Sequence, residues 1–265
     1  MIEEYVIKDG LKYCPKCNKP LEKRFPDTIF GKEFKVHIMC DCEREAYETE
    51  QRERADRERQ EELERNRSIC FHEKKMLDWI FANDDGSTPH LDKAKAFVDN
   101  WPEIRNRGAG LLLWGGVGTG KTYMAGCIAN ALLDQGKKVL MTDFVSITNI
   151  SAFSIQKYTA SLSVYDLLII DDLGAERRTE FALQNVFDVV NRRWESGKPL
   201  IVTTNLDLDV LKNAEDITMK RIYDRVLAMC TPVFINGPSK RKDIAEDKRL
   251  FYKSIFSKKG DEVDE

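Results

Sequence analysis

The chain has 265 residues, of which 42% are hydrophobic and 33% are charged, and its net charge is −3. This length and apolar content allow one large domain, or one domain with a small appendage. The charge balance excludes a nucleic-acid-binding surface that is basic over the whole molecule. The sequence has no apolar run near 18 residues and no signal-peptide pattern at its start, so we expect a soluble protein in the cytoplasm.

Four of the seven cysteines form two close pairs, Cys14 with Cys17 and Cys40 with Cys42. A β-like segment, Thr28 to Met39, precedes the second pair. This spacing predicts a structural zinc site with four thiolate ligands, in a small module over residues 1–43. So short a module buries too little apolar surface to fold unaided, and bound zinc would supply the missing stability.

Other interpretations of the cysteine module remain open. His37 is an alternative zinc ligand, and the first pair also fits a redox motif or unliganded thiols. A closed four-thiolate site has no open coordination position, so we predict no catalysis there. The remaining cysteines, Cys70, Cys127 and Cys230, lie in segments that we expect in the core or at its edge.

Residues 44–67 are dominated by Glu, Arg, Gln and Asp. These are mostly strong helix formers, and many opposite charges lie one turn apart, such as Glu50 and Arg54. We predict a solvated helical linker without a core face, which is either a spacer or a lever that presents the zinc module to a partner.

A larger domain is predicted over residues 68–257, followed by a polar tail over 258–265. It begins with two helices, Phe71 to Ala82 and Leu91 to Asn100, separated by a clear turn. We expect these helices to cover the base of a nucleotide.

The strongest motif is GGVGTGKT at Gly115 to Thr122, with an apolar strand before it and a helix, Tyr123 to Leu133, after it. Such a loop directs backbone N–H groups at a polyphosphate, and the helix N-terminus adds partial positive charge. Lys121 would reach the β- and γ-phosphates and Thr122 would bind Mg²⁺. A glycine-rich turn in an unrelated protein is the alternative. The predicted nucleotide contacts are Gly115, Gly116, Val117, Gly118, Thr119, Gly120, Lys121, Thr122 and Tyr123.

Strands and helices alternate after this loop, which predicts an α/β fold with a parallel sheet and crossover helices. The expected strands are 138–142, 165–171, 199–204 and 231–235, and the expected helices are 144–153 and 180–194.

Polar side chains follow two of these strands. Asp171 and Asp172 end the strand YDLLIID, where a carboxylate is placed to hold nucleotide-bound Mg²⁺, and we give that role to Asp171. Asp172 would orient or activate water, with Glu176 as a weaker candidate. Asn205 follows the next strand and can bond the attacking water or the γ-phosphate, although loop chemistry alone also explains an Asn there.

Arg221 and Arg225 are four residues apart and share one helix face. A planar guanidinium suits a γ-phosphate, but both arginines can equally pair with Asp224 or with other surface acids.

Taken in this order and spacing, the motifs resemble the AAA+ ATPases of the DnaC/DnaI helicase-loader group, with the transposition ATPase IstB as a close relative. The resemblance covers Ser68 to about Phe256, and the cysteine module resembles those of DnaI-like and phage-encoded loaders. It implies an AAA+ P-loop NTPase domain without a helical lid domain. It also implies a protein that binds ATP, assembles with copies of itself, and delivers a hexameric replicative helicase onto single-stranded DNA.

By position, the resemblance makes Lys121 and Thr122 the Walker A pair, Asp171 and Asp172 the Walker B pair, and Asn205 sensor 1. Arg225 corresponds to the arginine finger offered to a neighbouring copy, with Arg221 as second choice. Arg241 falls where a sensor 2 arginine acts. Two departures from the broader AAA+ pattern, the short Asp172 and the absence of a lid, imply slow, assembly-coupled hydrolysis. The alternatives are a transposition regulator and an adaptor that binds nucleotide without hydrolysing it.

Overall fold

The computed structural model describes residues 5–26, 33–84, 86, 88, 90–175 and 179–257, except for the side chains of 26, 33, 240–244 and 257. The chain divides into two compact units, Met1–Glu62 and Leu63–Glu265, and we describe each by itself. The predicted polar tail, 258–265, lies outside the described residues. No helix in the described part is long and apolar enough to cross a membrane.

The first unit contains two antiparallel hairpins. Strand β1 (Val6–Lys8) pairs with β2 (Leu11–Tyr13), and β3 (Glu22–Pro26) pairs with β4 (Glu33–His37). Asp9 and Gly10 both have positive φ, 51° and 70°, as a tight two-residue hairpin turn requires. Among the described residues of this unit, only Cys14 and Cys40 are buried. The described part of the unit therefore has no hydrophobic core of its own.

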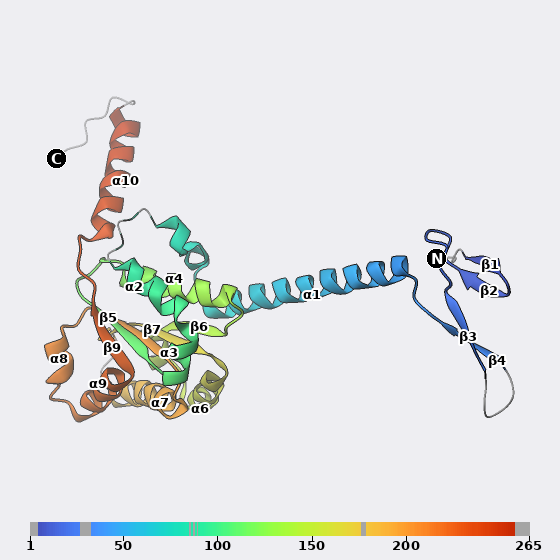
Figure 1. Ribbon diagram of the computed structural model, residues 1–265. Coiled ribbons are helices and arrows are strands. Elements are labelled where there is room, and N and C mark those ends of the chain that lie inside the picture. Colours follow the sequence, from blue (N-terminus) through green and yellow to red (C-terminus); the bar gives the residue numbers. More distant parts are fainter. Residues whose placement is uncertain are drawn as a thin grey trace. The chain divides into compact units, whose positions relative to one another are not determined.

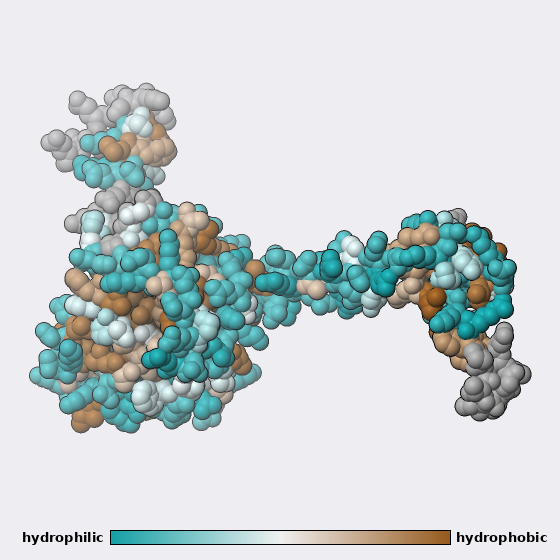
Figure 2. Space-filling model, viewed as in Figure 1, coloured by the Kyte–Doolittle hydropathy of each residue, from teal (hydrophilic) through white to brown (hydrophobic). Residues whose placement is uncertain are grey.

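The charged segment forms one long helix, α1 (Asp41–Cys70), which confirms the predicted helix and extends it at both ends. Figure 2 shows its almost continuous hydrophilic surface. Opposite charges one turn apart contact each other, as in Arg54 Nε to Glu58 Oε1 at 2.9 Å. At its C-terminal end, Cys70 is fully buried in the core of the second unit.

A five-stranded sheet forms the centre of the second unit (Figure 1). The strands are β5 (Gly110–Trp114), β6 (Val139–Asp143), β7 (Leu167–Leu173), β8 (Leu200–Thr204) and β9 (Cys230–Phe234). They are all parallel, in the order β6-β7-β8-β5-β9, which confirms the predicted α/β fold. Because β8 lies between β5 and β7, the residues that follow these three strands meet at one edge of the sheet.

Helices cover both faces of the sheet, and each face has its own apolar core. On one face α2 (Leu91–Asp99), α3 (Trp101–Arg107) and α4 (Lys121–Asp134) contribute buried side chains such as Trp101 and Ile128. On the other face lie α5 (Phe144–Thr148), α6 (Ala152–Ser161), α7 (Glu180–Ser196), α8 (Leu208–Lys212) and α9 (Ile217–Met229). Together the two apolar cores hold the strand ends that carry the predicted site in place.

The predicted helix Phe71 to Ala82 is wrong. The segment forms two short 3-10 helices instead, η1 (Lys74–Asp78) and η2 (Phe81–Asn83). The side chain of Asn130, on α4, donates hydrogen bonds to the carbonyls of Met76 and Trp79, at 2.9 and 3.0 Å. These tertiary contacts satisfy carbonyls that an α-helix would satisfy internally.

Two further differences concern the number of helices. The predicted helix 144–153 is divided into α5 and α6, and the carbonyl of Ile150, which lies between them, accepts a hydrogen bond from Asn185 Nδ2 at 2.9 Å. An additional helix that the sequence did not indicate, α10 (Lys240–Ser257), follows β9. It exposes the apolar side chains Leu250, Phe251, Tyr252, Ile255 and Phe256.

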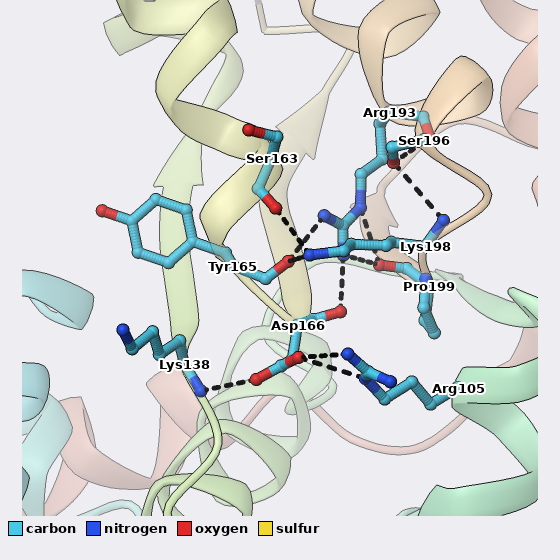
Figure 3. Close-up of polar contacts among 9 residues, drawn as sticks. All are labelled: Arg105, Lys138, Ser163, Tyr165, Asp166, Arg193, Ser196, Lys198 and Pro199. Atoms are coloured by element: carbon cyan, nitrogen blue, oxygen red, sulfur yellow. Dashed lines mark hydrogen bonds and ion pairs between the residues drawn. The ribbon is translucent and has the colours of Figure 1, made fainter.

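The buried side chain of Arg193 bonds the backbone at the end of the sheet opposite the glycine-rich loop, and Figure 3 shows its contacts. The Arg193 guanidinium donates to the carbonyls of Tyr165, Asp166 and Pro199, at 3.0, 2.8 and 3.0 Å, just before β7 and β8 begin. Burial lowers the pKa of Arg193 to about 10, and the charge of Asp166 opposes this shift, so the side chain stays charged at neutral pH.

We predict that Arg193→Met destabilises the protein by about 3 kcal/mol, because three buried or partly buried carbonyls lose a charged donor. Arg105→Ala is the matched control, since it removes only the half-exposed ion pair with Asp166, worth about 0.5 kcal/mol. Urea unfolding of both variants tests this. Equal losses in the two variants would show that the Arg193 network adds nothing beyond a surface ion pair.

Candidate functional site

The glycine-rich loop joins strand β5 to α4, and its backbone requires glycine. Gly115 and Gly118 have φ values of 139° and 81°. A Cβ on Gly115 would lie 2.3 Å from the carbonyl oxygen of Ile235, and one on Gly118 would lie 2.1 Å from Ser239 Oγ. The loop therefore passes against the segment after β9 and ends at the N-terminus of α4, where the backbone N–H groups of the first turn and the helix dipole favour an anion.

Lys121 connects this loop to the end of β8. Its ammonium group donates to the carbonyls of Gly115 and Gly116, at 3.0 and 2.7 Å, and to Asn205 Oδ1 at 2.8 Å. The side chain is buried, with a relative exposure of 5%. The structure thus brings together the predicted Walker A lysine and the predicted sensor.

Asp171 lies at the end of β7, facing Thr122. The Thr122 hydroxyl donates to Asp171 Oδ1 at 3.0 Å, and the Thr203 hydroxyl donates to the same oxygen. Burial raises the pKa of Asp171, and the negative charge of Asp172 raises it further, while the hydroxyl bonds oppose the rise. A divalent cation would offset both unfavourable effects, and a hydroxyl beside a carboxylate is the oxygen donor set that suits Mg²⁺.

Asp172 has an unusual backbone conformation for a non-glycine residue, with φ of 58°. The pairing of β7 with β8 shifts register between Ile170 and Leu173, so Asp172 lies in a bulge. Its N–H donates to Thr203 Oγ1 at 3.0 Å and its side chain is exposed. Left-handed residues held by surrounding bonds are concentrated at functional sites, and this one separates the directions of two successive carboxylates.

These groups line a cleft of about 940 Å³, large enough for a nucleotide. At the loop end it is lined by Val117, Gly118, Gly120, Lys121, Thr122, Asp171, Asp172 and Asn205. Gly115, Gly116 and Thr119 do not line it: the two glycines accept from Lys121, and Thr119 is buried with its hydroxyl on the Gly116 carbonyl.

The other end of the cleft is formed by residues from the segment that was predicted as a helix. His72, Met76 and Trp79 lie there, together with Tyr123 of α4, whose hydroxyl donates to the Ile80 carbonyl at 3.1 Å. Ring and thioether groups of this kind suit the face of a nucleotide base. The segment thus has the expected location beside the cleft with a different backbone. No motif pointed to Trp79 or to Lys248 of α10, and both residues line the cleft.

Arg221 and Arg225 lie on α9 and do not line the cleft of their own chain. Their guanidinium carbons are 4.3 and 4.8 Å from the ring centroid of Phe187 on α7. Among the described side chains, no carboxylate lies within 4.0 Å of either group, so the alternative pairing with Asp224 is wrong. Two predicted residues have no described side chain: Arg241 lies within α10, and Glu176 falls outside the described residues.

The four N-terminal cysteines form one cluster. The Sγ atoms of Cys14, Cys17, Cys40 and Cys42 all lie within 4.8 Å of one another. Tetrahedral zinc with four thiolates requires sulfurs about 3.8 Å apart, so the cluster fits this metal after a small contraction. A backbone hydrogen bond from Lys19 lowers the pKa of Cys17 to about 7, which favours the thiolate that zinc binds. His37 instead pairs with Glu43 at 3.2 Å and does not belong to the cluster.

The other cysteines are structural. Burial raises the pKa of Cys70 to about 12, and it raises the pKa of the fully buried Cys230 as well. Cys127 is also buried, so the prediction that these three belong to the core is confirmed.

Comparison with known proteins agrees with this site. A family model described as "IstB-like ATP binding protein" matches residues 44–247. The replicative helicase loader DnaC of Escherichia coli K12 is 30% identical over 152 residues, which are 54% of this chain and 58% of DnaC. The loader DnaI of Bacillus subtilis is 24% identical over 263 residues, covering 90% of this chain and 81% of DnaI.

A crystal structure of DnaI covers 66% of this chain and 98% of its own, with a TM-score of 0.55 and 22% identity, which shows a shared fold. The chain spans little more than half of DnaC's length. The predicted resemblance to DnaC and DnaI is confirmed by these matches. The family model extends over most of the sequence and includes the whole glycine-rich loop. The chain therefore belongs to the family of IstB-like ATP binding proteins.

Proposed function

We propose that this protein is an ATP-dependent loader that delivers a replicative DNA helicase onto single-stranded DNA. The observation that carries the proposal is the convergence of Lys121, Asp171 and Asn205, from three neighbouring strand ends, on one nucleotide-sized cleft. Helicase loading is the named activity of the relatives DnaC and DnaI.

In this proposal each cleft residue has a separate task. Lys121 exchanges its bonds to the loop carbonyls and Asn205 for the β- and γ-phosphates. Thr122 and Asp171 hold Mg²⁺, which when bound neutralises charge on the phosphate oxygens. Asp172 orients the attacking water, and Asn205, once released from Lys121, detects the γ-phosphate. Asp172 is one methylene shorter than glutamate, which supports slow conversion of ATP to ADP and phosphate.

The proposed assembly places the arginines of one copy against the ATP of another. Arg225→Ala is then expected to leave ATP binding unchanged and to lower hydrolysis by about 1,000-fold or more, as loss of an arginine finger does. Phosphate release measured across a range of protein concentrations tests this. Wild-type turnover that does not rise with protein concentration, or an unchanged rate in the variant, would remove the role in a neighbouring site.

Partner binding can be tested with the intact chain. We expect it to retain a hexameric replicative helicase in a pull-down with ATP and Mg²⁺, and to retain less of it when Lys121 is replaced by alanine.

Strand preference is the second readout: affinity for single-stranded DNA should exceed that for duplex and should fall steeply with salt. Preference for duplex DNA with no helicase retained would favour a transposition regulator instead.

One observation favours the loader over the transposition regulator. The alignment with DnaI covers 90% of this chain, so it extends into the unit that holds the cysteine cluster. We therefore propose that the zinc module and α1 contact the helicase, whereas the ATPase unit contacts DNA. An adaptor that binds nucleotide without hydrolysing it is the remaining alternative, and phosphate release stimulated by single-stranded DNA would exclude it.

A further inference from the structure

The side chains around Arg221 and Arg225 form a small preorganised group, which we call the arginine cradle: Phe187 and Asn191 of α7 with Arg221 and Arg225 of α9. Both guanidinium groups lie against the ring of Phe187, at 4.3 and 4.8 Å from its centroid. Arg225 Nε donates to Asn191 Oδ1 at 2.9 Å, and Arg225 Nη1 donates to the Arg221 carbonyl at 3.2 Å. The two helices thus each supply two members, one turn apart.

The residues of the cradle are held in place by the apolar core on the α7 and α9 face of the sheet. Phe187 is partly buried and packs against the apolar core on the α7 and α9 face of the sheet. On α9, Ile222 and Val226 follow the two arginines in sequence and are fully buried in that same core. Because both helices are anchored, the ring and the amide restrict two long side chains that would otherwise lose entropy on binding a ligand.

Neither arginine of the cradle forms an ion pair within the described part of the chain. No described carboxylate lies within 4.0 Å of either guanidinium. Two like charges one turn apart repel, and a ring face attracts a cation without cancelling its charge. A guanidinium has five N–H donors, and the two bonds of Arg225 use two of them. The remaining donors suit an anion with several oxygens, such as a phosphate.

We infer that Phe187 and Asn191 are positioning residues, which hold Arg221 and Arg225 ready for the terminal phosphate of ATP bound by a second copy of this chain. The inference rests on the proposed function, because the arginines do not line their own cleft. Phe187 sets the plane of both guanidinium groups, and Asn191 fixes the direction of Arg225.

The first test separates positioning from folding. Phe187→Leu keeps apolar volume but removes the ring face, and we expect kcat for ATP hydrolysis to fall by about 10-fold with KM for ATP unchanged. Phe187→Trp keeps a ring face and should restore most of the rate. Asn191→Leu, which removes the acceptor, should lower kcat in the same way. Urea unfolding of each variant measures any loss of stability separately.

The second test assigns the effect to the copy that donates the arginine. Arg225→Ala copies keep their nucleotide site, Lys121→Ala copies keep their cradle, and mixing the two should restore hydrolysis that neither shows alone. Phe187→Leu placed on the Lys121→Ala copy should reduce the restored rate by about 10-fold, as in the first test. The same substitution placed on the Arg225→Ala copy should leave the restored rate unchanged.

The outcomes distinguish the inference from the function on which it rests. If mixing Arg225→Ala and Lys121→Ala copies restores no hydrolysis, the arginines do not act on a neighbour, and both the proposed arginine role in a neighbouring site and the positioning role are overturned. If hydrolysis is restored and Phe187→Leu acts equally on either copy, or on neither, the proposed function stands and the positioning role is wrong.

Discussion

Replacing Lys121 with alanine is expected to abolish ATP binding. Its buried ammonium group donates to the carbonyls of Gly115 and Gly116 in the glycine-rich loop, which places it where the phosphates would lie. A charge-assisted bond to phosphate contributes about 3 kcal/mol, so its loss should weaken binding at least about 100-fold.

Thermal unfolding in the presence of MgATP measures this loss. At 100 times the Kd, ligand binding stabilises the folded state by about 2.7 kcal/mol, which raises the Tm of a domain of this size by about 5–10 °C. We expect this rise in the wild-type protein and none in the Lys121→Ala protein. Lys157→Ala is the matched control, because Lys157 is exposed on α6 and does not line the cleft. An equal rise in all three proteins would contradict the proposed role of Lys121.

Removal of metal is expected to unfold the N-terminal unit and leave the second unit folded. The described part of the first unit buries only Cys14 and Cys40, so two short hairpins have almost no apolar core to hold them. Structural zinc typically contributes about 10–16 kcal/mol to such small units, which makes the metal the main source of their stability. The second unit has two large apolar cores and does not depend on the cluster.

Native mass spectrometry and hydrogen exchange test this prediction together. The untreated chain should hold one zinc ion, and a chelator or Cys17→Ser should remove it and abolish protection in β1 to β4. Protection in β5 to β9 should persist. Cys127→Ala is the control, since Cys127 is buried in α4 and lies outside the cluster. Metal-free protein with full protection in the hairpins would show that zinc is not structural.

The phosphate loop and the sheet could be predicted because their signals are local. The strand Gly110–Trp114, the loop and the start of α4 follow one another in sequence, and glycine is needed at Gly115 for a reason that the motif already contains. Asp171 and Asn205 followed from the rule that parallel strands end at one edge of a sheet. The contacts of Asp171 with Thr122 and of Asn205 with Lys121 could not be predicted in the same way, because they depend on the order of the strands, which only the structure shows.

The remaining features depend on contacts between distant segments. The segment 71–82 has a helical pattern of apolar residues, yet it forms two 3-10 helices. In this segment the carbonyls of Met76 and Trp79 accept hydrogen bonds from the Asn130 side chain on α4. The arginine cradle joins Phe187 to residues more than thirty positions later, and the sequence pattern left Arg221 and Arg225 equally able to pair with Asp224. No spacing rule links an aromatic residue on one helix to a cation on another.

The most direct test of the account is a calorimetric titration of MgATP into the intact, zinc-loaded chain. We predict a saturating binding heat with one ATP per chain, reduced strongly when Mg²⁺ is omitted or when Asp171 is replaced by asparagine. Folded protein that gives no heat with MgATP would contradict the assignment of the cleft, and with it the proposed loader and its arginine cradle.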